Sequence, residues 1–283
     1  MSNRAYLDKA LLTVWQLRLF GRYRGDVVLV VGDDLKGAIR PLEKSLLRIT
    51  PIHFPDIERS SEDALLRGAK STLGAQSGKT FQFHKFFCFS PFFKKWNNIL
   101  YIDAKMRIYA PISPILRLNC SDSIVAHSDS YPDFQRTLRD QFNFLDFPEL
   151  ELGLEREANL DADFFQTTMM YFDSSIIEEG SVEELVTLSR RFPNSRTNDQ
   201  GIINIWSQGK NLWTRLPTAR PGGGFFYDFH ERAGREASDY IMLKYPKYPQ
   251  KTAARSISNY AFSLFRTLEN RRTRLWERAS SGS

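Results

Sequence analysis

The sequence contains few of the features that mark secreted or membrane-spanning proteins. It has only two cysteines, Cys88 and Cys120, in 283 residues, and their spacing fits neither a metal site nor a disulfide-rich scaffold. No run approaches the roughly 18 apolar residues that a membrane-spanning helix needs. The first twenty residues carry charges typical of a surface helix rather than of a signal peptide. We therefore expect a folded protein of a reducing compartment, the cytoplasm.

Most of the chain also lacks the charge of a nucleic-acid-binding protein. The formal net charge is +6, but residues 251–283 hold seven basic and two acidic side chains and so account for +5 of it. The preceding 250 residues are close to neutral, which argues against a nucleic-acid partner. The sequence also argues against a nucleotide-triphosphate loop. The segment 74–80 has three residues between its glycines where such a loop needs four, and a solvated turn is the better interpretation.

Apolar residues are plentiful, at 42% of the chain with 22 phenylalanines, so a large core is expected. Helix-like and strand-like segments alternate along the chain, which is typical of an α/β domain with a largely parallel sheet. The sequence predicts strands at 26–31, 49–54, 98–103, 123–126 and 167–172. It predicts one helix that begins at about residue 7, a second that ends at Leu47 and a third over 81–96. A further helix over 181–188 would be capped by Ser181 with Glu184.

Carboxylates at two places suggest binding chemistry. Asp103 directly follows a predicted apolar strand, and ligands of open α/β sheets gather at the carboxyl ends of strands. Asp161 and Asp163 form a literal Asp-x-Asp, a spacing that lets two carboxylates share a divalent cation. That pair precedes a strand instead of following one. We therefore expect a turn or a substrate contact there, and the ligand site at Asp103.

Three blocks of sequence resemble a known family. The first is 80–106, with a ring-rich segment that contains Lys85 and a strand that ends at Asp103. The second is 164–173, and the third is 198–204, which begins Asn-Asp-Gln. In order and rough spacing these blocks resemble the core of GT-A nucleotide-sugar glycosyltransferases, especially the glycogenin-like family eight. The resemblance covers about residues 80–205.

The resemblance implies a Rossmann-like GT-A domain over residues 1–250, with a mixed, mostly parallel sheet flanked by helices. It implies transfer of a sugar from a nucleotide-diphosphate donor to a glycan or protein acceptor, with retention of configuration. By the same resemblance Lys85 contacts the donor, Asp103 holds the ribose or a metal, and Asp199 and Gln200 line the space around the reactive carbon. The structural alternatives are a surface lysine, a strand-end cap and a helix N-cap cluster.

The chain departs from the family pattern at three places. Lys105 stands where the family has its second aspartate, which predicts weaker dependence on Mn²⁺ or Mg²⁺ and an ammonium near the leaving diphosphate. An alternative is a catalytically inactive relative that binds a sugar nucleotide or a partner protein. Gln166 stands where the family has asparagine, and it is expected to contact substrate. The family opens with a strand before its first helix, whereas helix-like sequence begins here by Tyr6.

The last part of the chain supplies further candidates. His230 is a candidate metal ligand, Lys244 a candidate phosphate contact and Asp163 a candidate substrate contact. In residues 251–283, apolar side chains recur at helical spacing from Ile257 to Leu268 with arginines mostly off that stripe. This basic amphipathic helix is expected to pack on its own domain, or to contact a membrane surface or a partner protein.

Overall fold

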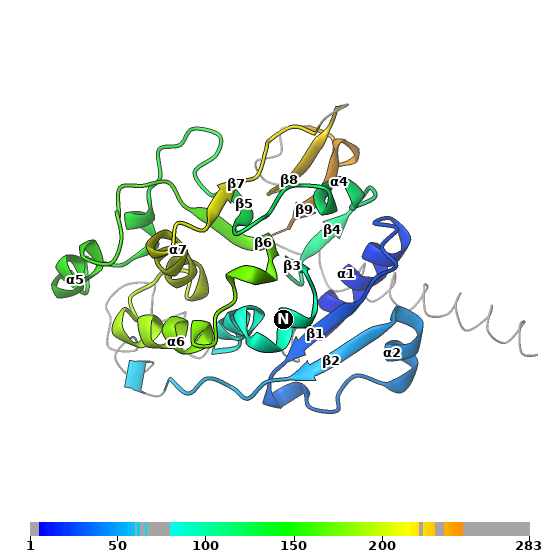
Figure 1. Ribbon diagram of the computed structural model, residues 1–283, viewed down its shortest axis with the longest axis horizontal. Coiled ribbons are helices and arrows are strands. Elements are labelled where there is room, and N and C mark those ends of the chain that lie inside the picture. Colours follow the sequence, from blue (N-terminus) through cyan, green and yellow to red (C-terminus); the bar gives the residue numbers. More distant parts are fainter. Residues whose placement is uncertain are drawn as a thin grey trace, which may run out of the picture.

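The computed structural model describes residues 6–59, 61–62, 66, 80–220, 223–229 and 235–245 (Figure 1). Its strands are β1 Val27–Val31, β2 Ile49–His53, β3 Asn98–Ile102, β4 Met106–Ile108, β5 Ile124–Ser128, β6 Phe165–Asp173, β7 Trp213–Arg215, β8 Phe225–Phe229 and β9 Tyr240–Lys244. Its α-helices are α1 Leu7–Leu19, α2 Pro41–Leu47, α4 Ser113–Leu116, α5 Glu151–Glu155, α6 Ser181–Arg191 and α7 Asp199–Gly209. Shorter 3₁₀ helices include η3 Thr80–Phe89 and η4 Pro91–Lys95.

The described strands form three sheets. β1 and β2 pair in parallel, the central sheet has the order β3-β6-β5-β7, and a third sheet has the order β4-β9-β8. In the central sheet β6 is antiparallel to both β3 and β5, and β7 is parallel to β5. The mixed α/β architecture is therefore confirmed. Parallel pairs do not predominate, because each of the three parallel pairs is matched by an antiparallel one.

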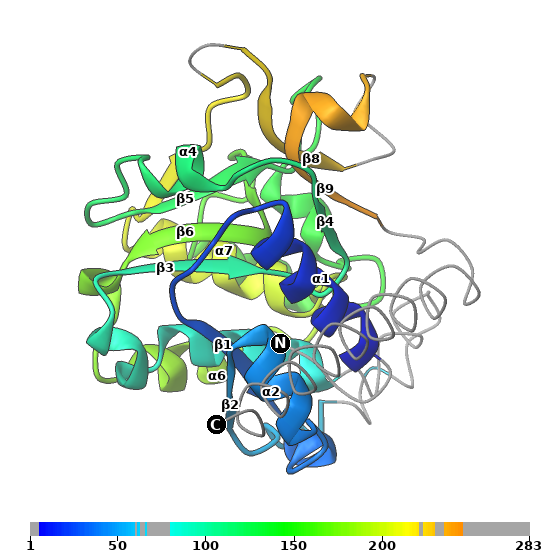
Figure 2. The same ribbon diagram turned by 90° about the vertical axis from the view of Figure 1, so that its right-hand side faces the viewer.

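Alternating side chains let the central sheet pack on both faces. On β6, Met170 and Phe172 join the core formed with η3, α6 and α7, whereas Met169 and Tyr171 join the core formed with β4, β8 and β9. This alternation is the two-residue period of a strand buried on both sides. Figure 2 shows α7 behind the central sheet and α1 in front of it. The layers leave the carboxyl end of β3 next to the start of α7.

Most predicted elements are confirmed, with two corrections. The segment 81–96 forms two 3₁₀ helices, η3 and η4, because Pro91 begins a new helix after the Ser90 cap. The helix that begins at Ser181 forms, but the capping box is wrong. Ser181 is already helical and its hydroxyl accepts a hydrogen bond from the Glu178 N–H, while Glu184 accepts one from the Trp206 indole. His230 and residues 251–283 lie outside the described residues.

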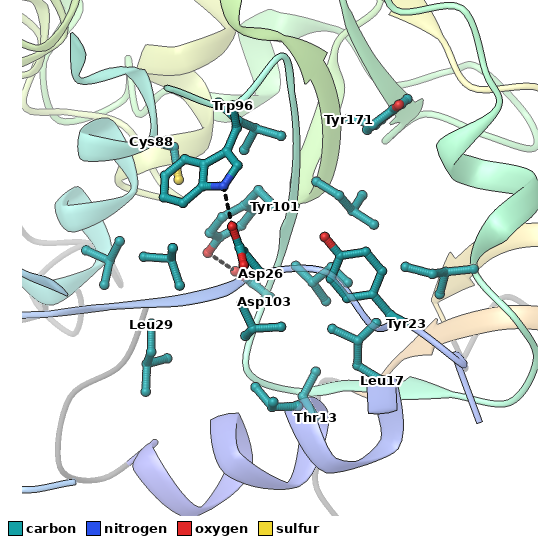
Figure 3. A pocket seen from close by; sticks show the side chains of 18 of the residues that line it. Thr13, Leu17, Tyr23, Asp26, Leu29, Cys88, Trp96, Tyr101, Asp103 and Tyr171 are labelled. Carbon is teal, nitrogen blue, oxygen red and sulfur yellow. Dashed lines mark hydrogen bonds between the residues drawn. The ribbon is translucent and has the colours of Figure 1, made fainter. Parts of the chain in front are cut away.

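A cavity of about 390 Å³ separates β1 from β3 (Figure 3). No backbone ladder joins these strands in the part of the chain that the structure describes, although the Trp96 indole donates a 2.8 Å hydrogen bond to Asp26 at their beginnings. The wall is largely apolar and comes from β1, β3 and α1, and Asp103 reaches it at the end of β3. From residue 6 onward α1 is the first described element. It lines this cavity together with β1 and β3.

Two remaining expectations concern cysteines and membranes. Cys88 and Cys120 are buried and unbridged, and burial raises the pKa of the Cys88 thiol to about 12. Among the described residues, no helix is long and apolar enough to span a bilayer.

Candidate active site

The side chain of Lys85 lies at the centre of a buried cluster of charged groups. Its ammonium is 2.5 Å from the Asp199 carboxylate and 3.6 Å from the Asp103 carboxylate, and it donates a 2.9 Å hydrogen bond to the Thr167 hydroxyl. Lys244 forms an ion pair with the other oxygen of Asp103. Four of the sequence-predicted residues, Lys85, Asp103, Asp199 and Lys244, therefore meet at one place.

Separate elements carry these side chains to that place. Asp103 follows the last residue of β3, and Asp199 is the first residue of α7, so both stand where an element begins or ends. Lys85 projects from η3. The residue before Lys85, His84, is buried, and its Nε2 lies 3.0 Å from an oxygen of Asp56. Lys244 is the last residue of β9. This strand pairs with β4, which begins immediately after the turn that follows β3.

The pKa values of the cluster follow from burial and from neighbouring charges. Burial opposes the charged form of Asp103, but Lys244 and Lys85 hold the pKa of its carboxyl well below the ordinary value. Burial also opposes the Lys85 ammonium, yet Asp103 and Asp199 raise its pKa. Burial raises the pKa of Asp199 in spite of Lys85, and lowers that of Lys244 in spite of Asp103. Removing any one member leaves a buried charge without compensation.

Amide side chains form a second, adjoining network. Gln166 donates a 2.9 Å hydrogen bond to one oxygen of Asp129, and Gln200 donates one of 3.3 Å to the other. The Tyr227 hydroxyl donates a 2.6 Å bond to the Gln166 carbonyl. Thr167 joins the two networks, because its N–H donates to Gln200 while its hydroxyl donates to Asp199. The predicted residues Gln166 and Gln200 thus border the charged cluster.

The other predicted residues lie at the edges of this arrangement. Lys105 follows the end of β3 by three residues, and its ammonium lies 5.1 Å from the centre of the Tyr6 ring. Asp163 is not in the cluster. It accepts hydrogen bonds from the hydroxyls of Ser128 and Ser130 and pairs with an arginine, so it holds the loop on either side of Asp129. Its neighbour in the literal Asp-x-Asp, Asp161, pairs instead with Arg139 at the surface.

Sequence reasoning missed four residues of the site: Tyr101, Asp129, Thr167 and Tyr227. Asp129 had a usable signal, because it directly follows β5 just as Asp103 follows β3. Tyr101 donates a 2.6 Å hydrogen bond to Asp103 but looks like an ordinary core residue of an apolar strand. The positions of Thr167 and Tyr227 depend on which segments meet, which no local pattern shows.

The donor set does not fit a divalent metal. Among the described ranges, no group of three or more histidine, cysteine, aspartate or glutamate side chains is placed to hold one. Both oxygens of Asp103 already have partners, Tyr101 and Lys85 on one and Lys244 on the other. A further ammonium, that of Lys105, stands where the resemblance expects a second carboxylate. Hard divalent cations need several oxygen ligands, which this arrangement does not offer.

Neither a family model nor a curated protein matches the sequence. Solved structures do match. The galactosyltransferase LgtC, in complex with donor and acceptor sugar analogues, has a TM-score of 0.57 at 10% identity, and the match covers 93% of this chain and 94% of LgtC. An active-site mutant of LgtC has a TM-score of 0.58. The bifunctional glycosyltransferase WbbM has a TM-score of 0.55 at 14% identity, over 88% of this chain and 45% of WbbM.

The chain spans less than half the length of WbbM but nearly all of LgtC. At these identities the likeness concerns the fold, and membership of the glycogenin-like branch stays a prediction. The order of the three sequence blocks and the similarity to these solved structures agree. This chain has the GT-A fold of glycosyltransferases.

Proposed function

We propose that this protein is a glycosyltransferase that moves a sugar from a nucleoside-diphosphate donor to an acceptor hydroxyl on a glycan or protein. The observation that carries the proposal is the position of Lys85 and Lys244 around Asp103, at the carboxyl end of β3. Ammonium groups at a strand end suit the charge of a diphosphate. The acidic and amide groups beside them suit the sugar.

In this proposal each network has its own task. The ammonium groups of Lys85 and Lys244 attract the diphosphate and stabilise the negative charge that develops on it as the sugar leaves. Asp199 and Gln200 line the space around the anomeric carbon, where positive charge develops in the transition state. Gln166, held by Asp129 and Tyr227, positions the sugar hydroxyls. We propose retention of configuration, as the glycogenin-like resemblance implies.

The test is a screen of sugar nucleotides, with nucleoside-diphosphate release and thermal shift as readouts. A true donor at one hundred times its dissociation constant should stabilise the fold by about 2.7 kcal/mol. With that donor, Asp199→Asn should lower turnover by on the order of a hundredfold. Asp161→Asn, at the exposed Arg139 pair, is the matched control and should keep turnover. If no sugar nucleotide binds or is turned over, the proposal is wrong.

A second candidate is an inactive relative that binds a sugar nucleotide or a partner protein. The observation that favours it is Lys105, which stands in place of an expected carboxylate. The same screen separates the two functions. Stabilisation by a donor without turnover on any glycan or protein acceptor, and without slow hydrolysis, would favour the binding protein.

A further inference from the structure

Both carboxylate oxygens of Asp103 already have protein partners, so a cation would have to displace one of them. The Tyr101 hydroxyl is 2.6 Å from its Oδ1, and the Lys85 ammonium is 3.6 Å from the same atom. The Lys244 ammonium donates a hydrogen bond to Oδ2. The carboxylate is thus already neutralised by two ammonium groups, one from η3 and one from the end of β9.

Lys105 adds a third ammonium group to the same edge. Its backbone carbonyl accepts a hydrogen bond of 3.4 Å from the N–H of Tyr245, the residue after Lys244. The next residue, Met106, pairs with Lys244 in the β4–β9 ladder. Lys105 is therefore tied to the end of β9. Burial lowers the pKa of Lys244 most, and the charges of Lys85 and then Lys105 lower it further. The three lysines act on one small region.

The sign of the local charge decides what this region attracts. Lys85 and Lys244 pair with Asp103, and Lys85 also pairs with Asp199, so these four charges balance. Lys105, whose backbone is tied to the end of β9 and whose ammonium lies beside the Tyr6 ring, adds one positive charge near them. Such a region repels a divalent cation and attracts a polyanion. Lys244 and Asp103 remain partly accessible, with side chains 11% and 22% exposed, so a ligand at the end of β3 reaches them.

We propose that Lys85, Lys105 and Lys244 bind the donor diphosphate directly and stabilise its departure without a resident divalent metal, with Lys244 occupying the cation position on Asp103. This inference rests on the proposed function. In the transfer, the bond between the anomeric carbon and the β-phosphate oxygen breaks and its electron pair stays on that oxygen. The acceptor oxygen bonds to the anomeric carbon, and its proton passes to the departing diphosphate. The ammonium groups stay protonated and supply only charge.

The first experiment measures binding of inorganic pyrophosphate and of UDP to the full chain by calorimetry, in EDTA and in Mn²⁺. Once the Mn²⁺ complexes that pyrophosphate and UDP form in solution are taken into account, the dissociation constants should agree within about twofold between the two conditions. Lys244→Met and Lys105→Met should each weaken pyrophosphate binding by on the order of tenfold. Lys94→Met, at an exposed lysine of η4, is the control and should not change it. Lys105 is only partly buried, so its variant tests the idea even if Lys244→Met fails to fold.

The second experiment counts bound Mn²⁺ by electron paramagnetic resonance. Wild-type protein without nucleotide should leave Mn²⁺ free, whereas the double variant Lys105→Asp with Lys244→Ala should bind it. Absence of pyrophosphate binding, or binding that EDTA abolishes and Mn²⁺ restores, overturns the inference.

The two proposals fail differently. Metal-independent pyrophosphate binding without transfer from any sugar nucleotide would reject the glycosyltransferase function alone. Transfer that stops in EDTA would reject the lysine inference alone.

Discussion

The ammonium of Lys85 and the carboxylate of Asp199 are 2.5 Å apart, and each side chain is almost completely buried. The pair joins η3 to the first turn of α7, and both elements pack on the same face of the central sheet. Both charges have left water, so each depends on the other and on Asp103 and Thr167 for compensation. This pair couples the fold to the chemistry proposed for the site.

Breaking that pair should cost both stability and turnover. Lys85→Met leaves two buried carboxylates close together and should lower the free energy of unfolding by about 3–5 kcal/mol. It should lower turnover by on the order of a hundredfold. Urea unfolding and initial rates measure the two effects, with Lys94→Met as the control. Wild-type stability and rate in the Lys85 variant would remove this lysine from both roles.

Asp103 should make the protein sensitive to acid. Its carboxyl has a pKa held below the ordinary value of 3.8, so its stabilising ion pairs are fully present above that pH. They are lost as the pH falls through the lower pKa of the folded state. Asp103→Asn should therefore cost on the order of 2 kcal/mol at pH 7 and much less near pH 2. Urea unfolding at both pH values measures the difference, and an equal cost at both would contradict the ion-pair explanation.

Tyr227→Phe should affect the sugar more than the diphosphate. The hydroxyl donates to Gln166 and shares a 2.6 Å hydrogen bond with Thr168, so its removal leaves a buried amide oxygen without its donor. That loss costs about 1–3 kcal/mol. A loss of about 1.4 kcal/mol of transition-state stabilisation should lower donor turnover by roughly tenfold, while pyrophosphate binding stays as in wild type. Weaker pyrophosphate binding in this variant would contradict the assignment of Tyr227 to the network that positions the sugar.

Removing residues 251–283 should remove the basic segment without affecting donor binding. This segment carries +5 of the +6 net charge, and the cluster around Asp103 is complete without it. The shortened chain should bind the donor as tightly as the full chain, with changed solubility or association. Calorimetry and light scattering measure both. Unfolding of the shortened chain would show that its apolar stripe belongs to the core.

Much of the site was predictable from local sequence patterns. Short β-branched or apolar runs predict strands such as β1 and β3, because buried strands need apolar side chains on both faces. The residue after such a run stands at the carboxyl end of the sheet, which places Asp103. The likeness of three blocks to a family then pointed to Lys85, Asp199 and Gln166. These inferences need only neighbours in sequence.

Only the tertiary structure decided the partners of these residues. Lys244 reaches Asp103 across 141 residues, from a strand of a different sheet, and no local pattern encodes that distance. Asp129, Gln166 and Tyr227 come together for the same reason, because the packing of β5, β6 and β8 sets which polar groups must satisfy one another. Sequence determined which residues carry charge at the ends of elements. Packing determined that two lysines, rather than further carboxylates, surround Asp103.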